Sequence, residues 1–276
     1  MAGTLYLCPT PIGNLKDITQ RVLEVLEEVD FIAAEDTRRT KQLLNYFEID
    51  KRTFSYHEHN KEKAGEKVLQ LLEEGHSIAI VTDAGMPGIS DPGEDIVREC
   101  IDAGIEIICL PGPSAFVNAL VISGFSTTTF SFEGFVDRNK KKRRAYFESI
   151  QYLPKTLIFY EAPHRLKEFL ADMLLVLGNR RVSISRELTK KYEETFRGTV
   201  EEGLAYFTEK DPKGEFVIVV EGGSGEVVET FYEAMTVQEH LLHYINEGMS
   251  KKEAIKKVAD ERKIKKSDVY KESLSL

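Results

Sequence analysis

Cysteine is scarce in this sequence, and long apolar runs are absent from it. The 276 residues include three cysteines, Cys8, Cys100 and Cys109, with no C-x-x-C pair among them. Such an odd and scattered set supports neither a disulfide framework nor a structural zinc site. No run of about 18 apolar residues occurs, and no basic segment precedes the short apolar stretch at the N-terminus. We therefore expect a soluble, unprocessed cytoplasmic protein that does not contact a membrane.

The common nucleotide and metal motifs are also missing. No G-x-G-x-x-G follows the first apolar run, and no G-x-x-x-x-G-K-[ST] occurs, so neither a nicotinamide Rossmann site nor a P-loop is supported. There is no H-E-x-x-H motif. His57 and His59 flank Glu58, but in an extended segment these side chains alternate between two faces and cannot close one metal site. We expect no bound metal.

Acidic residues outnumber basic ones, and the excess is uneven along the chain. The 37 Lys and Arg against 46 Asp and Glu give a net charge of −9, which argues against a uniform polycation that binds nucleic acid. Residues 249–272, however, hold nine Lys or Arg and five Asp or Glu. A second basic cluster consists of Arg138, Lys140, Lys141, Lys142, Arg143 and Arg144. This cluster is either a solvated loop or a clamp for RNA phosphates, and two concentrated patches favour RNA.

Short apolar runs rich in β-branched residues predict strands. Six such runs cover residues 4–8, 30–34, 77–82, 106–110, 156–160 and 215–220. Helix-like segments lie between the early runs, over residues 19–29, 37–47, 61–74 and 94–103. This alternation of strand and helix predicts an α/β protein whose first sheet is parallel and doubly wound.

The pattern changes in the second half of the chain. Short strands come closer together around one strong helix over residues 163–177, which predicts a second α/β domain with a mixed sheet. Beyond a glycine-rich linker, two polar helices over residues 250–262 and 267–273 each open on a Ser N-cap and predict a helical hairpin. The predicted parts are an N-terminal α/β domain (1–118), a second α/β domain (119–223) and a basic helical C-terminal region (224–276).

Three loops rich in glycine and proline follow predicted strands, over residues 9–14, 82–93 and 111–115. Any one of them is as well explained by an ordinary turn. Ligands in open α/β sheets bind outside the carboxyl ends of the strands, and glycine and proline give loops that approach a ligand closely and stay in place. Three such loops together therefore favour a binding site.

Charged residues also stand between strands and helices. Glu35, Asp36 and Glu161 occupy such positions, where a carboxylate is equally explained as a helix cap. Arg38, Arg39 and the pair at residues 164–165 are cations near predicted helix N-termini, which the helix dipole disfavours. These cations predict an anionic partner.

The order of nine segments resembles that of a known family. TPIGN, AEDTR, YHEHN, TDAGMPGISDPG, LPGPSA, YEAPHRL, RELTKKYEE, FRGTV and KGEFVIVVEGG occur in this order between residues 9 and 223. The sequence is thereby similar to the small-subunit ribosomal RNA cytidine 2′-O-ribose methyltransferases, a branch of the tetrapyrrole (corrin/porphyrin) methylase superfamily. The resemblance implies a homodimer of a two-domain α/β fold, with S-adenosylmethionine in the cleft between the domains.

The resemblance also implies which residues contact the cofactor. They fall in the loops after strands, and they are Ile12, Gly13, Asn14, Gly85, Met86, Pro87, Ile89, Ser90, Ser114, Ala115, Glu161, Leu188, Thr189 and Gly222. Met86 takes the place of an aspartate in the relatives' Gly-Asp-Pro loop, so the resemblance does not fix how the methionine end of the cofactor is held.

Methyl transfer to a ribose hydroxyl requires alignment of the nucleophile and exclusion of water. The reaction gains from a general base, for which Asp36 and Glu35 rank ahead of His57, and from a cation such as Arg38 or Lys190 that stabilises the alkoxide. The sequence thus predicts a 2′-O-methyltransferase of a cytidine in small-subunit ribosomal RNA, acting on the RNA or the subunit. The alternatives are a tetrapyrrole or other small-molecule methylase on the same fold, and a non-catalytic ribosome-assembly factor.

Overall fold

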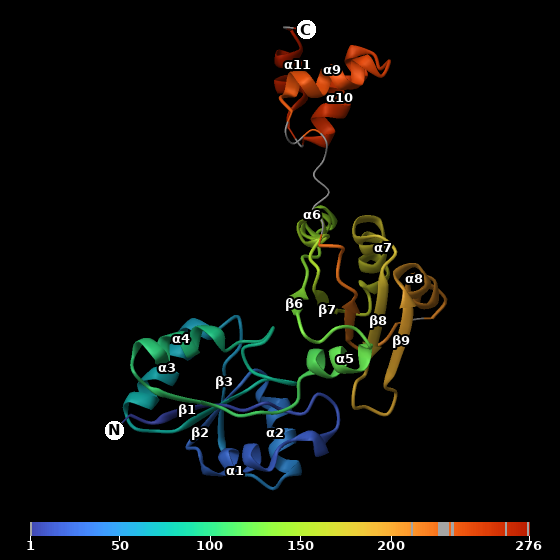
Figure 1. Cartoon of the computed structure of the whole chain (residues 1–276). Coiled ribbons are helices and arrows are strands. Elements are labelled where there is room, and N and C mark those ends of the chain that lie inside the picture. The colour runs from blue at the N-terminus through green and yellow to red at the C-terminus, as the bar shows by residue number, and fades with distance from the viewer. Residues whose placement is uncertain (1, 211, 226–231, 233–234, 263, 275) are drawn as a thin grey trace. The chain divides into compact units, whose positions relative to one another are not determined.

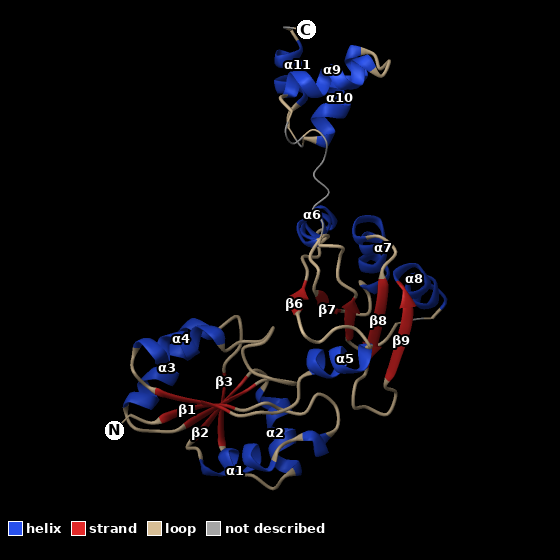
Figure 2. Cartoon of the chain, viewed as in Figure 1, coloured by secondary structure: helices blue, strands red, loops and turns tan. Residues whose placement is uncertain are grey.

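The computed structural model of the chain divides into two compact units. It describes residues 2–210, 212–225, 232, 235–262, 264–274 and 276. Unit 1 is Met1–Gly225 and unit 2 is Glu226–Leu276, and the two units are described separately below. Figure 1 labels the elements, and Figure 2 shows that unit 1 combines helices with strands whereas unit 2 is helical.

The first half of unit 1 is a five-stranded parallel sheet in the order β3-β2-β4-β1-β5. Its strands are β1 (Thr4–Leu7), β2 (Phe31–Ala34), β3 (Arg52–Ser55), β4 (Ile78–Val81) and β5 (Glu106–Cys109). Between them lie η1 (Leu15–Asp17), α1 (Gln20–Glu28), α2 (Thr37–Tyr46), α3 (Lys61–Glu73) and α4 (Glu94–Asp102). One apolar cluster joins α3 and α4 to the sheet and another joins α1 and α2. Helices therefore cover both faces, and the predicted doubly wound parallel sheet is confirmed.

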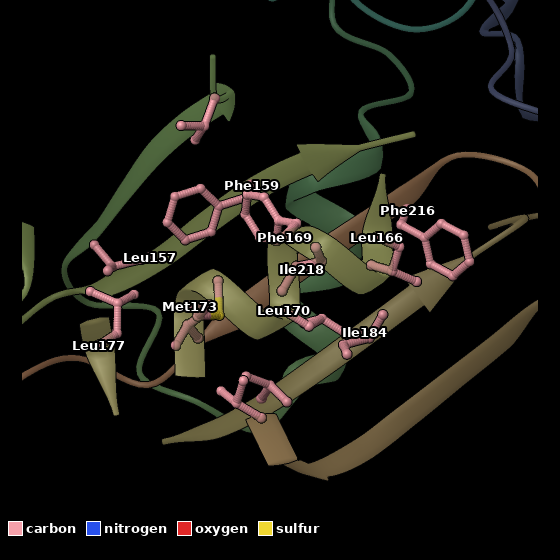
Figure 3. Packing of buried hydrophobic residues seen from close by; sticks show 14 of the residues in the cluster. Leu157, Phe159, Leu166, Phe169, Leu170, Met173, Leu177, Ile184, Phe216 and Ile218 are labelled. Atoms are coloured by element: carbon pink, nitrogen blue, oxygen red, sulfur yellow. The ribbon is translucent and has the colours of Figure 1, made fainter. Parts of the chain in front are cut away.

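The second half of unit 1 is a mixed five-stranded sheet in the order β6-β7-β10-β8-β9. Its strands are β6 (Phe130–Phe135), β7 (Thr156–Glu161), β8 (Arg181–Arg186), β9 (Glu194–Thr199) and β10 (Phe216–Val220). β6 and β7 are parallel, and the other pairs are antiparallel. Helices α6 (Lys140–Ile150), α7 (Leu166–Leu177) and α8 (Val200–Glu209) share one apolar core with this sheet, in which Phe159, Phe169 and Ile218 meet (Figure 3). Helix α5 (Ala115–Ser123) packs in a separate cluster that includes Ile158 and Val217.

The expectation of one helix in this half is wrong, because α6 and α8 are present as well. The run of cations at residues 140–144 opposes the helix dipole and is typical of a loop. Helix α6 forms nonetheless, since Asn139 Oδ1 accepts hydrogen bonds from the backbone N–H groups of Lys141 and Lys142. Helix α8 begins at a capping box formed by Thr199 and Glu202. Local capping thus overrides the charge pattern.

Unit 2 contains helices α9 (Val237–Asn246), α10 (Lys251–Glu261) and α11 (Lys266–Ser273), packed around one apolar cluster. The Ser N-cap at the start of α10 is confirmed, because Ser250 forms a capping box with Glu253. The second Ser N-cap is wrong, since α11 starts one residue earlier, after Lys265, and has no side-chain cap. With α9, the described part of unit 2 is a three-helix bundle and not a hairpin. None of the described helices of the chain is long and apolar enough to cross a membrane.

Candidate functional site

A cavity of about 250 Å³ lies in unit 1 where the ends of the two sheets face each other. From the first sheet it is lined by residues that follow β2 and β4, such as Glu35 and Asp83. From the second sheet it is lined by Tyr160, by residues 185–188 and by residues 215–217. These second-sheet residues lie at the ends of β7 and β8 and at the start of β10, which runs antiparallel to both. The strand ends of both sheets therefore build one site.

A neighbouring cavity of about 460 Å³ lies beside the first. The two share five lining residues, Ile12, Arg39, Asp83, Ala84 and Lys190. Gly13 lines the second cavity only. The predicted loop after β1 thus borders both cavities.

The loop after β1 is in direct contact with the loop after β8. The backbone N–H of Asn14 donates to Thr189 Oγ1 over 3.0 Å. A Cβ on Gly13 would lie 2.4 Å from Lys190 Cγ and 2.8 Å from Thr189 Oγ1, so only glycine permits this approach. Thr189 itself has a φ of 66°, an uncommon conformation for a residue other than glycine. Residues that the sequence placed in two separate domains are therefore held together at the cavity.

The glycine-rich loop after β4 contributes fewer residues than predicted. Ser90 lines the first cavity, whereas Met86, Pro87 and Ile89 line neither cavity. Gly85 anchors this loop to the loop after β1 by two backbone hydrogen bonds with Thr10, of 2.9 and 3.0 Å. The Met86 sulfur lies 3.9 Å from Cys109 Sγ, away from the lining. In the loop after β5, Ala115 lines the cavity and Ser114 does not.

Carboxylates dominate the first cavity. Five carboxylate side chains line it, against three cationic ones. They are Glu35, Asp83, Asp91, Glu187 and Glu215, and the cations are Arg39, Arg186 and Lys190. Ion pairs join Arg39 to Asp83, Lys190 to Glu187, and Arg186 to Glu194 outside the lining. The cavity keeps an excess of negative charge.

Burial and mutual repulsion raise the pKa of two of these acids. Burial raises the pKa of Glu35, even though its side chain accepts a hydrogen bond from the backbone N–H of Asp83. Burial raises the pKa of Asp91 to about 7, and the charges of Glu35, Glu215 and Asp83 add to the shift. Both shifts follow from burial among like charges, while the three cations of the lining are held in ion pairs with Asp83, Glu187 and Glu194. Among the described residues no cluster of His, Cys, Asp or Glu is suited to a metal ion.

The catalytic candidates from the sequence separate into two groups. Glu35 and Lys190 line the cavity. Asp36 caps α2, accepts hydrogen bonds from the backbone and side chain of Arg38, and has a pKa lowered by those hydrogen bonds. Arg38 is exposed, and neither it, Asp36 nor His57 lines either cavity. Asp36 and Arg38 therefore interact with each other at the N-terminus of α2.

Two further candidates lie away from the cavity. The Glu161 side chain is buried; its Oε1 accepts from the backbone N–H of Ala162 over 2.8 Å and pairs with Arg165 Nε over 3.2 Å. Tyr160, the preceding residue of β7, lines the cavity instead, because adjacent strand residues face opposite sides. Gly222 follows the far end of the antiparallel β10 and packs on Lys155. Neither Glu161 nor Gly222 lines either cavity.

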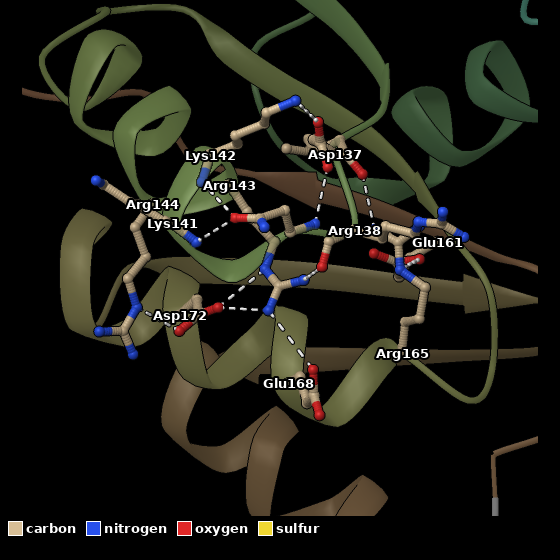
Figure 4. A network of polar contacts seen from close by, with 12 residues as sticks. Asp137, Arg138, Lys141, Lys142, Arg143, Arg144, Glu161, Arg165, Glu168 and Asp172 are labelled. Carbon is tan, nitrogen blue, oxygen red and sulfur yellow. Dashed lines mark hydrogen bonds and ion pairs between the residues drawn. The ribbon is translucent and has the colours of Figure 1, made fainter.

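The basic cluster is partly structural (Figure 4). The Arg143 side chain is 1% exposed, and its Nε donates to Asp172 Oδ2 over 2.9 Å. Arg144 Nε donates to the other oxygen of Asp172 over 2.6 Å. The prediction that Arg143 contacts RNA is therefore corrected, because its guanidinium fastens α6 to α7. Lys142 pairs with Asp137 over 3.3 Å and remains exposed.

Three cations of the cluster stay available on the surface. Arg138, Lys140 and Lys141 are exposed, and within the described part of the chain no ion pair involves them. They follow β6 directly, and the last residue of that strand, Phe135, lines the first cavity. Three exposed cations thus lie three to six residues after a residue that lines an acidic cavity.

Sequence reasoning missed several lining residues, among them Asp83, Asp91, Tyr160 and Glu215, and it chose Arg38 over Arg39 as the catalytic cation. Asp83 and Asp91 stand inside the loop at residues 82–93, so their signal was present in the motif. Arg39 is the residue after Arg38 on α2, and only the tertiary structure decides which of the two side chains points toward the cavity.

Two solved structures share the α/β fold of this chain. A uroporphyrin-III-C-methyltransferase from Thermus thermophilus superposes with a TM-score of 0.57 at 20% identity, covering 81% of this chain and 95% of that one. A diphthine synthase superposes with a TM-score of 0.62 at 14% identity, covering 80% and 90%. At these identities the likeness defines the fold alone.

The sequence comparisons define the family. The model of the Tetrapyrrole (Corrin/Porphyrin) Methylases matches residues 4–203. Proteins named "Ribosomal RNA small subunit methyltransferase I" from Halalkalibacterium halodurans and Bacillus subtilis are 54% and 49% identical, each over 97% of this chain and 93% of the relative. A relative of the same name from Thermotoga maritima is 48% identical over 220 residues, which are 80% of this chain and 99% of that protein. The chain therefore belongs to the tetrapyrrole methylase family and is a methyltransferase, as the resemblance predicted.

Proposed function

We propose that this methyltransferase uses S-adenosylmethionine to methylate the ribose 2′-oxygen of a cytidine in small-subunit ribosomal RNA. The observation that carries the proposal is the 54% identity, over 97% of the chain, to a relative whose name states small-subunit ribosomal RNA methylation. The exposed cations beside the cavity support an RNA substrate, since phosphate contacts dominate RNA affinity.

The first cavity fits S-adenosylmethionine by its charge. That molecule carries a sulfonium and an ammonium group, and the cavity has an excess of carboxylates, two of them with raised pKa values. We propose that Asp91, Glu215 and Asp83 contact the sulfonium and ammonium groups of the cofactor. Its uncharged parts then contact Ile12, Ala115 and Leu188. The bound cofactor supplies a methyl group on a positively charged sulfur, open to in-line attack.

The residues of the chain align the ribose, remove its proton and exclude water. Glu35 is the general base that we propose, because it lines the cavity and burial raises its pKa, which makes its carboxylate a stronger base. Lys190 lines both cavities and is the cation that we assign to the developing alkoxide. The two side chains come from the loops of different sheets, so closure of these loops around the ribose sets the alignment.

The RNA surface that we propose consists of Arg138, Lys140 and Lys141 near the cavity, with the basic helical region of residues 249–272 as a second contact. The partner is small-subunit RNA or the subunit itself, and we propose a homodimer and a cytoplasmic location. The domain limits at residues 118 and 223 stay predictions.

A methyl-transfer assay tests the proposal. Purified protein with labelled S-adenosylmethionine is incubated with small-subunit particles or their RNA, and label is expected on a cytidine ribose. The absence of transfer to either substrate refutes the proposal.

Two variants separate the alternatives. Reversal of the charges at Arg138, Lys140 and Lys141 weakens an RNA enzyme but leaves a small-molecule methylase active. Gly85→Arg places a large side chain in the loop beside the cavity. If cofactor binding is lost while RNA binding and subunit assembly persist, the chain is an assembly factor.

A further inference from the structure

Phe135 presents an aromatic ring at the rim of the acidic cavity. Its side chain is 50% exposed although it lines the cavity. The ring lies 5.4 Å from that of Tyr160, a second lining residue, at an interplanar angle of 59°. An exposed phenyl group usually stands alone on a surface. Here it belongs to the lining of a site whose other side chains are mostly polar.

A bulge in β6 turns Phe135 toward the cavity. In the parallel β6–β7 pair, Phe132 is opposite Ile158 and Phe135 is opposite Tyr160. The step along β6 is three residues, whereas the step along β7 is two. Glu133 is the extra residue, and its carboxylate instead accepts a hydrogen bond from Tyr146 of α6. Without the bulge, the alternation of strand side chains would put Phe135 on the α6 side.

The residue after the extra one has the conformation that the bulge requires. Gly134 has a φ of 59°, in the left-handed region that favours glycine. A Cβ at this position would lie 3.4 Å from Ser90 Oγ, in the loop after β4. The bulge thus sits against the cavity loop, and bulges of this kind re-aim side chains beside active sites.

The charge on either side of the ring restricts what can lie on it. The cavity below is rich in carboxylates and repels phosphate. The surface beyond, at Arg138, Lys140 and Lys141, is cationic and exposed. A nucleic acid can keep its phosphates over the cations while an uncharged, flat group rests on the phenyl ring. Single-stranded RNA bases stack on aromatic side chains in this way.

We propose that Phe135 is the stacking platform for the nucleobase of the nucleotide whose ribose enters the cavity. The inference rests on the proposed function, and it identifies the side chain that recognises an unstacked base. Phe135 acts on the substrate and not on the cofactor.

The test compares Phe135→Ala, Phe135→Leu and Phe135→Tyr in the full chain. Stacking is worth about 1–3 kcal/mol per base, so we expect kcat/KM for small-subunit particles to fall roughly ten- to hundredfold in Phe135→Ala. Phe135→Leu keeps apolar bulk but no aromatic face, and it is expected to lose nearly as much. Phe135→Tyr retains activity. The dissociation constant for S-adenosylmethionine, measured by calorimetry, stays within about twofold in all three.

Phe130→Ala is the matched control. Phe130 is an exposed phenylalanine of the same strand that lines neither cavity, so its loss leaves kcat/KM unchanged. The inference is overturned if Phe135→Ala behaves like this control, if Phe135→Leu restores activity, or if cofactor binding weakens in step with the rate. If the wild type transfers no methyl group to RNA, the proposed function fails and this inference with it; an active wild type with an indifferent Phe135 sinks the inference alone.

Discussion

At the scale of single residues, Gly13 is where the loop after β1 touches the loop after β8. An added side chain at this position would overlap Lys190 Cγ, Thr189 Oγ1 and the carbonyl oxygen of Leu188. We predict that Gly13→Val displaces residues 188–190 and weakens S-adenosylmethionine binding at least about tenfold, the equivalent of 1.4 kcal/mol. Isothermal titration calorimetry measures the effect.

Gly104→Ala controls for a general loss of stability. Gly104 has a φ of 68° and nothing within 4 Å of an added Cβ, so alanine strains the backbone between α4 and β5 without touching the cavity. We expect this variant to unfold at a lower temperature and to bind the cofactor normally. Equal weakening of binding in both variants would contradict the steric explanation.

The acidic side chains of the cavity predict a pH dependence of cofactor binding. In the cofactor-free protein the pKa of Asp91 is raised to about 7, by burial and by Glu35, Glu215 and Asp83. A bound cation favours the carboxylate, lowers this pKa and releases a proton. Affinity therefore rises with pH, by up to about tenfold per unit below pH 7, and levels off above it.

Calorimetry in buffers of different ionisation enthalpy checks this prediction. Proton release is expected near pH 6 and should vanish at pH 8.5. Asp91→Asn should bind more weakly and lose most of the dependence. An affinity that falls with rising pH would contradict the assignment.

The sequence predicted the loops that border the cavity better than the individual side chains that line it. It predicted Glu35, Ser90, Leu188 and Lys190 in loops that follow strands, and all four line the first cavity, because parallel strands end at a common edge. It could not distinguish Arg38 from Arg39, since consecutive helix residues point about 100° apart and only packing decides which faces the cavity. The raised pKa of Asp91 depends on three carboxylates from distant segments and has no local sequence signal.

At the scale of elements, helix α6 is fastened by a buried ion pair. Arg143 and Asp172 are 1% and 3% exposed, and their contact joins α6 to α7. Burial alone would raise the pKa of Asp172, but the hydrogen bonds from Arg143 and Arg144 lower it overall. The cationic surface beside the cavity is therefore held in place by one of its own arginines.

Loss of that arginine should destabilise the fold. Arg143→Ala leaves Asp172 buried with only Arg144 as a partner, and we predict a loss of about 3–5 kcal/mol in the free energy of unfolding. Lys141→Ala, on the exposed face of the same helix, should change it by less than about 0.5 kcal/mol. Urea denaturation compares the two, and similar losses would rule out the anchoring role.

Apolar patterns predict helices and strands well when the element buries one face. They predict edge strands and irregular strands less well. The β3 segment has one large apolar side chain, Phe54, and lies at the sheet edge, so its pattern predicts no strand. The direction of β10 is set by its antiparallel partners, so Gly222 follows the end of β10 that lies away from the cavity lining, and a single strand gives no sign of this. The β6 bulge depends on pairing with β7 and is invisible in a single strand.

At the scale of the whole molecule, the two cavities and the basic region of residues 249–272 belong to different units. The lining residues of both cavities belong to unit 1. The Thermotoga relative aligns over 99% of its length in 220 residues and has no room for counterparts of both units. We therefore expect unit 2 to add RNA affinity and not to complete the active site.

A pair of charge reversals in unit 2 tests this division. Lys252 and Lys256 are exposed, one helical turn apart on α10. We predict that the double Lys→Glu variant binds small-subunit RNA more weakly. The slope of its affinity against salt concentration, on logarithmic scales, should become shallower by about one for each RNA phosphate that the variant no longer neutralises. Its affinity for S-adenosylmethionine should not change. Reversal of Arg21 and Lys63 on unit 1 is the control, and an equal effect there would indicate nonspecific attraction.

The position of β10 has a consequence for how the chain folds during translation. β10 is the last strand to be synthesised, yet it lies in the centre of its sheet, between β7 and β8. The first sheet can fold while the ribosome is still translating, because its strands end at Cys109. In the second sheet, the edges of β7 and β8 that pair with β10 stay unpaired until residues 216–220 leave the ribosome. Because residues 215–217 also line the cavity, a nascent chain cannot assemble the complete site before almost all of unit 1 has been made.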